Sequence, residues 1–124
     1  MNIKSAFFLV KFLEDVGYTG SRHFDAHAYR TEDYEGVKDF ARGCMRNYLI
    51  LKDKAARWNA NKEIASILKE VSSNANGAPK IGSYSKKSAA TLLAHNFDKD
   101  AIMKKRIPYE RLDQLTIDIL TGAR

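Results

Sequence analysis

The side chains best suited to metal chemistry lie close together near residue 25. His23, Asp25 and His27 form an H-x-D-x-H motif, in which the two histidines are four residues apart. On a helix this spacing could place both imidazoles on one metal ion, as in zinc hydrolases. Phe24 stands where that pattern carries glutamate, and no third ligand is evident. We therefore interpret the motif as polar side chains of a solvent-facing loop, predict no metal or cofactor, and keep a metal-dependent hydrolase as a third alternative.

The nucleophilic side chains give no pattern that points to catalysis. Cys44 lies on the apolar stripe of an expected helix, where a thiol packs as a small hydrophobe. His95 has serines and carboxylates near it in sequence, but their spacing marks no catalytic triad. The chain contains neither a P-loop nor a glycine-rich turn from strand to helix for a nucleotide. We therefore predict no catalytic residue and a protein that is not an enzyme.

Positive charge is concentrated in one part of the chain. The 124 residues carry 21 basic and 15 acidic side chains, a net charge of +6. Within 80–106 only Asp98 and Asp100 oppose seven basic residues, the first candidates for phosphate contacts: Lys80, Lys86, Lys87, Lys99, Lys104, Lys105 and Arg106. Arg42 and Arg46, one helical turn apart, extend this set unless Asp39 and Asp53 pair with them.

The C-terminal segment 85–122 contains two runs with a recognisable pattern, Phe97-Asp98-Lys99-Asp100-Ala101-Ile102 and Arg106-Ile107-Pro108. Through these runs the segment resembles the helix-turn-helix of small Cro-like phage repressors. The chain departs from that pattern at Leu92, His95 and Asn96, where the motif has a small residue, an apolar residue and glycine. The resemblance implies a DNA-binding protein whose second helix enters a major groove with Lys99 near its beginning, while Lys104, Lys105 and Arg106 reach phosphates.

Apolar residues at helical spacing predict the elements that carry these groups in the first half of the chain. A first helix over about 2–16 begins at Asn2 and stops at Gly17, and it is apolar on nearly all sides. A long helix over about 32–58, capped by Thr31, has one apolar stripe, made of Val37, Phe40, Cys44, Tyr48, Leu51, Ala55 and Trp58. Leu49 and Ile50 lie off this stripe, which predicts cover on two sides at mid-helix. A third helix follows Asn59 or Asn61.

The second half divides at the loop 74–84. Beyond it, Ser83 or Ser85 caps a short helix, a basic segment follows, and Pro108 opens a last helix that ends at Gly122. We therefore predict an all-α fold, a compact bundle of about five to six helices with one long central helix and a C-terminal helix-turn-helix-like segment. It forms a single domain, 1–124, or divides into a helical core, 1–73, and a basic subdomain, 80–124.

These features predict a nucleic-acid-binding protein, with DNA favoured over RNA. The alternative is a helical protein–protein interaction factor: an adaptor, subunit or inhibitor of a larger, phage- or plasmid-related nucleic-acid-processing assembly, or a homodimer formed through the apolar first helix. Aromatic residues that look exposed favour this alternative, namely Tyr18, Phe24, Tyr29, Tyr34 and Tyr84. The single cysteine and the short apolar run Ala6–Val10, broken by Lys11, predict a cytoplasmic protein without a membrane partner.

Overall fold

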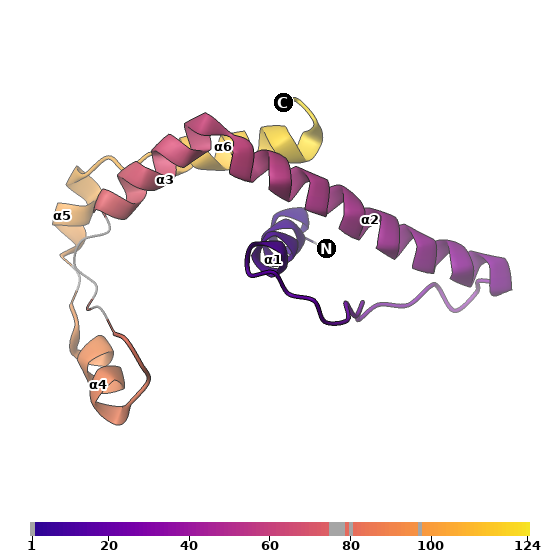
Figure 1. The fold of residues 1–124 in the computed structure, drawn as a ribbon, viewed down its shortest axis with the longest axis horizontal. Helices are drawn as coiled ribbons and strands as arrows, with labels where there is room; N and C mark the ends of the chain where they lie inside the picture. The colour runs from indigo at the N-terminus through magenta and orange to yellow at the C-terminus, as the bar shows by residue number, and fades with distance from the viewer. Residues whose placement is uncertain (1, 75–78, 80, 97) are drawn as a thin grey trace. The chain divides into compact units, whose positions relative to one another are not determined.

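The structure, a computed structural model, describes residues 2–74, 79, 81–96 and 98–124. Within these ranges it contains six α-helices and no strand (Figure 1). The helices are α1 (Ile3–Asp15), α2 (Tyr34–Ala60), α3 (Lys62–Asn74), α4 (Lys86–Ala94), α5 (Lys99–Lys104) and α6 (Tyr109–Thr121). The predicted all-α class, the number of helices and the long helix are confirmed. Lys80, Phe97 and most of the predicted loop 74–84 lie outside the described residues.

The chain forms two units, each with its own contacts. The first contains Met1–Asn61 and Leu115–Arg124, and the second contains Lys62–Gln114. The choice between a single domain and a division near residues 73–80 stays a sequence prediction.

Side-chain caps explain where the helices of the first unit begin and end. The Asn2 side chain accepts a hydrogen bond from the Lys4 amide at 3.0 Å, and Gly17 adopts φ +64°, the left-handed conformation that ends a helix. The predicted cap of α2 was wrong by two positions. Asp33, not Thr31, caps the helix, because its carboxylate accepts from the Gly36 amide at 2.9 Å.

The caps of the later helices follow the prediction more closely. Ser85 caps the N-terminus of α4 and forms a reciprocal capping box with Ser88. Gly122, with φ +81°, follows the end of α6. Pro108 lies one position before α6 rather than in its first turn, and its carbonyl accepts from the Leu112 amide at 3.2 Å.

The core of the first unit joins α1, the C-terminal half of α2 and the C-terminal half of α6. Phe7 and Leu115 are fully buried, and the other buried residues are Val10, Ala55, Trp58, Thr116, Ile119 and Leu120. The Trp58 indole lies edge-on to Phe8, with ring centroids 6.2 Å apart. On α2, Lys54 donates to the Ile119 carbonyl at 2.6 Å, which satisfies a backbone acceptor near the C-terminus of α6.

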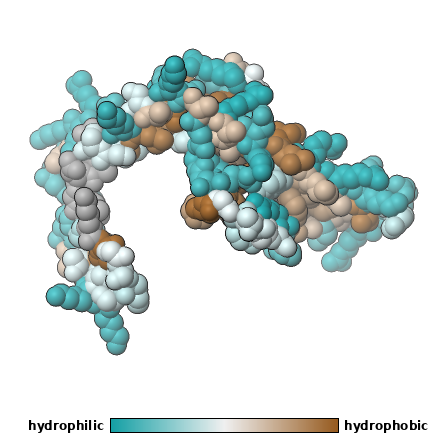
Figure 2. Space-filling view, in the orientation of Figure 1, coloured by the Kyte–Doolittle hydropathy of each residue, from teal (hydrophilic) through white to brown (hydrophobic). Residues whose placement is uncertain are grey.

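One face of α1 has no cover within the described residues. Leu9, Phe12 and Val16 are about 60% exposed, at 60, 62 and 59%, and lie opposite the buried Phe7 and Val10. Apolar residues, in brown, reach the surface around α1 in Figure 2. The predicted second cover over the middle of α2 is also missing, because Leu49 and Ile50 are 63 and 46% exposed.

The second unit has a small core. Ile64 and Ile67, on one face of α3, are its buried apolar residues among those described. Arg111 donates to the Glu63 carboxylate at 2.6 Å, so an ion pair joins the beginnings of α3 and α6. No helix in the described part of the chain is long and apolar enough to cross a membrane.

Candidate functional site: a polar anchor and an exposed loop

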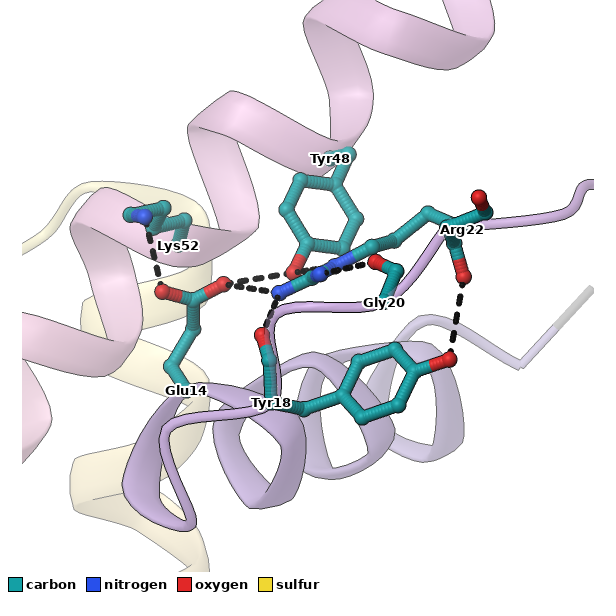
Figure 3. Close-up of polar contacts among 7 residues, drawn as sticks. Glu14, Tyr18, Gly20, Arg22, Tyr48 and Lys52 are labelled. Atoms are coloured by element: carbon teal, nitrogen blue, oxygen red, sulfur yellow. Dashed lines mark hydrogen bonds and ion pairs between the residues drawn. The ribbon is translucent and has the colours of Figure 1, made fainter.

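A cluster of polar side chains ties the loop 17–33 to α1 and α2. Figure 3 shows the Arg22 side chain extending from the loop toward Glu14 of α1, beside the Tyr48 ring of α2. Arg22 Nε donates to Tyr48 Oη at 2.9 Å, and one of its terminal nitrogens contacts Glu14 Oε1 at 3.4 Å. Tyr48 donates its hydroxyl to the same Glu14 oxygen at 2.5 Å, and Lys52 Nζ lies 2.7 Å from Glu14 Oε2. We call Glu14, Arg22, Tyr48 and Lys52 the anchor.

The anchor favours the ionised form of its carboxylate. Hydrogen bonds from Lys52 and Tyr48, with a smaller contribution from Arg22, lower the pKa of Glu14 from 4.5 to about 2. The side chains of Glu14 and Arg22 are only 22 and 25% exposed. Both oxygens of the half-buried Glu14 carboxylate therefore have charged or hydroxyl donors. Hydrogen bonds to an ionised group of this kind are stronger than those between neutral groups.

Arg22 also organises the backbone of its own loop. It donates to the carbonyls of Gly20 at 2.5 Å and Tyr18 at 2.7 Å. The guanidinium carbon lies 4.9 Å from the centre of the Tyr18 ring and 5.5 Å from that of Tyr48, within the range of cation–π contacts. One side chain thus joins the beginning of the loop to two helices.

The sequence prediction missed this cluster. Arg22 lies 8 positions from Glu14 and 26 from Tyr48, so neither pair has a helical spacing that would reveal it. Tyr48 was placed on the apolar stripe, correctly, but its hydroxyl provides the polar contact. A basic residue in a glycine-containing loop was the only available signal.

The H-x-D-x-H motif lies beyond the anchor, in the exposed part of the loop. His23, Asp25 and His27 are exposed, and His27 Nδ1 lies 2.8 Å from the Ala28 carbonyl. Among the described residues no three histidine, cysteine, aspartate or glutamate side chains are grouped so that they could hold a metal ion. An open hollow of about 540 Å³ separates the loop from the beginning of α2, lined by His27, Ala28, Tyr29, Glu32, Gly36, Asp39 and Phe40.

The two candidate arginines lie on α2, in the first unit. Arg42 donates to Asp39 at 2.9 Å in an ion pair whose side chains are 62 and 78% exposed. Arg46, one turn further on, is also exposed. The intrahelical pairing proposed as an alternative for Arg42 is therefore present, and such exposed pairs contribute little free energy.

The remaining basic candidates belong to the second unit. Lys86 and Lys87 are exposed in the first turn of α4, and Lys99 and Lys104 are exposed on the six-residue helix α5. Lys105 caps α5 and is half-buried, and Arg106 is exposed with φ +47°. Lys80 lies outside the described residues. The order of α4, α5 and α6 matches the predicted succession of short helices.

Comparison with known proteins finds relatives that the sequence patterns did not suggest. The helical chain is similar over nearly its whole length to curated enzymes, although no family model matches it. It is 45% identical over 124 residues to a xylose isomerase of Thermus caldophilus and 46% identical to that of Thermus thermophilus. It is 41% identical over 132 aligned residues to a xylose isomerase of Streptomyces lividans. These alignments cover 99% of this chain, but 32, 32 and 31% of the relatives, so the chain spans about a third of their length.

These relatives correct two predictions. The prediction of a DNA-binding protein is wrong, because similarity along almost the whole chain is to proteins named as isomerases. The prediction of a protein that is not an enzyme is contradicted by the same relatives. The physical cause of the error is that a local excess of lysine looks the same in sequence whether it contacts phosphate or only water. The local resemblance of 85–122 to Cro-like repressors stays a sequence prediction.

Proposed function

We propose that this chain is part of an enzyme that isomerises xylose. The observation that carries the proposal is the 46% identity, over 99% of the chain, to the enzyme of Thermus thermophilus. Since that alignment covers 32% of the relative, the proposed enzyme also needs polypeptide equivalent to the remaining two thirds. A cytoplasmic location belongs to the same proposal and is supported by the single, half-buried Cys44, which suits a reducing compartment.

Within such an enzyme we assign α1 and α2 a packing role. The exposed face formed by Leu9, Phe12 and Val16 is unusual for a surface helix, whose apolar residues ordinarily face a core. Contiguous apolar side chains of this kind are what protein–protein contacts bury. The support is for a protein partner, either the rest of the enzyme or a second copy, of which the second copy is the homodimer that the sequence predicted.

The loop 17–33 is assigned the role of carrying functional groups, in contrast to the packing role of the helices. It offers two imidazoles and a carboxylate, from His23, His27 and Asp25, on an exposed segment that begins at the anchor. Functional groups are often carried by loops that a rigid scaffold positions. We assign this loop to the surface that faces the rest of the enzyme.

A chimeric enzyme tests the proposed function. The region of the Thermus thermophilus enzyme that aligns with this chain is replaced by residues 1–124, and the same enzyme without that region is the control. We expect the chimera to isomerise xylose and the deletion variant to be inactive. A chimera that is folded and assembled, as judged by circular dichroism and sedimentation, yet does not isomerise xylose would contradict the proposal.

A further inference from the structure

The loop 17–33 is not held by burial of apolar side chains. Of its residues only Arg22 and Ala28 are half-buried, and all the others are exposed. Even its large aromatic residues face solvent: Phe24 is 44% and Tyr29 is 82% exposed. Segments with few buried apolar contacts ordinarily open at little cost in free energy. The contacts that hold this loop in place must therefore be polar.

Backbone hydrogen bonds also contribute little to the first half of the loop. Among those found in the described residues, the amides of Gly17 and Tyr18 bond back to α1, and the next one within the loop joins Glu32 to Tyr29. Between these points the contacts are made by side chains. The Tyr18 hydroxyl donates to the Ser21 carbonyl at 3.4 Å, and Arg22 makes the contacts of the anchor.

Arg22 has the geometry required to hold the beginning of this segment. Each of its three nitrogens donates: Nε to Tyr48, one terminal nitrogen to Gly20, and the other to Tyr18 and Glu14. A planar guanidinium can make these contacts at once because its donors point in fixed, divergent directions, which a lysine ammonium cannot reproduce. The acceptors belong to α1, α2 and the loop itself (Figure 3).

We propose that Arg22 is the positioning residue of the loop: by joining Glu14 of α1 to Tyr48 of α2 it orders residues 18–30, and so presents His23, Asp25 and His27 from a fixed base. The residue acts through the loop and is not itself a catalytic group. The ordering of the loop is independent of the proposed function. Its consequence for catalysis rests on the proposed function.

The ordering is tested on the 124-residue protein with Arg22→Gln. The matched control is Arg42→Gln, which removes an arginine from an exposed ion pair of α2 outside the anchor. Chymotrypsin measures the opening of the loop, because Phe24 and Tyr29 are its sites and neither substitution alters them. We expect cleavage at these two residues to become about tenfold or more faster in Arg22→Gln, and unchanged in Arg42→Gln.

Backbone nitrogen-15 relaxation distinguishes a loss of order confined to the loop from a loss of order in the helices as well. In Arg22→Gln the heteronuclear Overhauser effects should fall for residues 18–30 and stay at wild-type values in α1 and α2. Three results would each overturn the proposal. These are a loop already mobile in the wild type, cleavage unchanged by Arg22→Gln, and loss of order throughout α1 and α2, which would make Arg22 a residue of the general fold.

The consequence for catalysis is tested in the chimera. There Arg22→Gln should lower kcat for xylose about tenfold while the melting temperature and oligomeric state stay those of the parent chimera. An unchanged kcat in an active chimera would show that the positioning of the loop by Arg22 does not affect the rate of isomerisation. A parent chimera without activity would instead count against the proposed function, and the result on loop order would stand.

Discussion

The indole nitrogen of Trp58 donates a 3.0 Å hydrogen bond to Thr116 Oγ1 in the interior of the first unit. Both residues are almost fully buried, at 6 and 1% exposure. They lie 58 positions apart, and the bond connects α2 with α6. A tryptophan in an interior needs a partner for its N–H, and Thr116 provides it without bringing a charge into the core.

Removing this acceptor should destabilise the fold measurably. Thr116→Val keeps the shape of the side chain but leaves the Trp58 N–H buried without an acceptor, so we expect a loss of about 1–3 kcal/mol in the free energy of unfolding. Urea denaturation followed by tryptophan fluorescence provides the measurement. Thr121→Val, at an exposed threonine of the same helix, should change stability by less than about 0.5 kcal/mol. Equal effects of the two substitutions would refute the assignment of Thr116 as the acceptor that stabilises the buried Trp58 N–H.

Two phenylalanines of α1 should differ sharply in their contribution to stability. Phe7 is fully buried, and Phe12 is 62% exposed. Phe7→Ala leaves a cavity and should cost about 3–5 kcal/mol, whereas Phe12→Ala should cost less than about 0.5 kcal/mol in the isolated chain. Denaturant midpoints of the two variants check this, and similar losses would mean that α1 is packed differently.

The exposed face of α1 should matter once a partner is present. In the chimeric enzyme Leu9→Ser combined with Phe12→Ser should weaken assembly by about tenfold or more, because two apolar anchors are lost from a contact. Analytical ultracentrifugation at a series of concentrations measures the effect. The matched control is Leu93→Ser, at an apolar residue of α4 that is 88% exposed. Assembly unaffected by the double substitution would exclude this face as an interface between copies of the enzyme.

Acid should weaken the anchor in a defined pH range. Because folding lowers the pKa of Glu14 from 4.5 to about 2, the carboxylate stabilises the native state above pH 4.5. That contribution is lost as the pH falls from about 4.5 toward 2, because in this range Glu14 is protonated in the unfolded chain but still ionised in the folded protein. The stability difference between the wild type and Glu14→Gln should therefore be largest near neutral pH and disappear near pH 2. Urea titrations at several pH values would detect a difference independent of pH, which would contradict this account.

Local rules recovered most of the helices from the sequence. Asn2, Gly17 and Gly122 act within one or two turns of their own position, so their types reveal the ends of α1 and α6. Where two good caps stood close together, as Thr31 and Asp33 do, residue type could not decide between them. The deciding quantity was the distance from the side-chain oxygen to a backbone amide, which only the structure gives.

Tertiary relationships were beyond the sequence. Glu14, Arg22 and Tyr48 meet because α1 packs on α2 and the loop returns across both, and no spacing along the chain encodes that meeting. The apolar circumference of α1 was recognised, but which side Phe7 or Phe12 faced depended on the position of α2. The lysine-rich segment led to a wrong function because charge alone does not name a partner.

The central claim, that this chain forms part of a xylose-isomerising enzyme, is tested most directly by steady-state kinetics of the chimera that carries residues 1–124. The account predicts a kcat/KM for xylose within about tenfold of the Thermus thermophilus parent, since 46% identity over this region should preserve its packing. A folded, fully assembled chimera with no more activity than the deletion variant would contradict it.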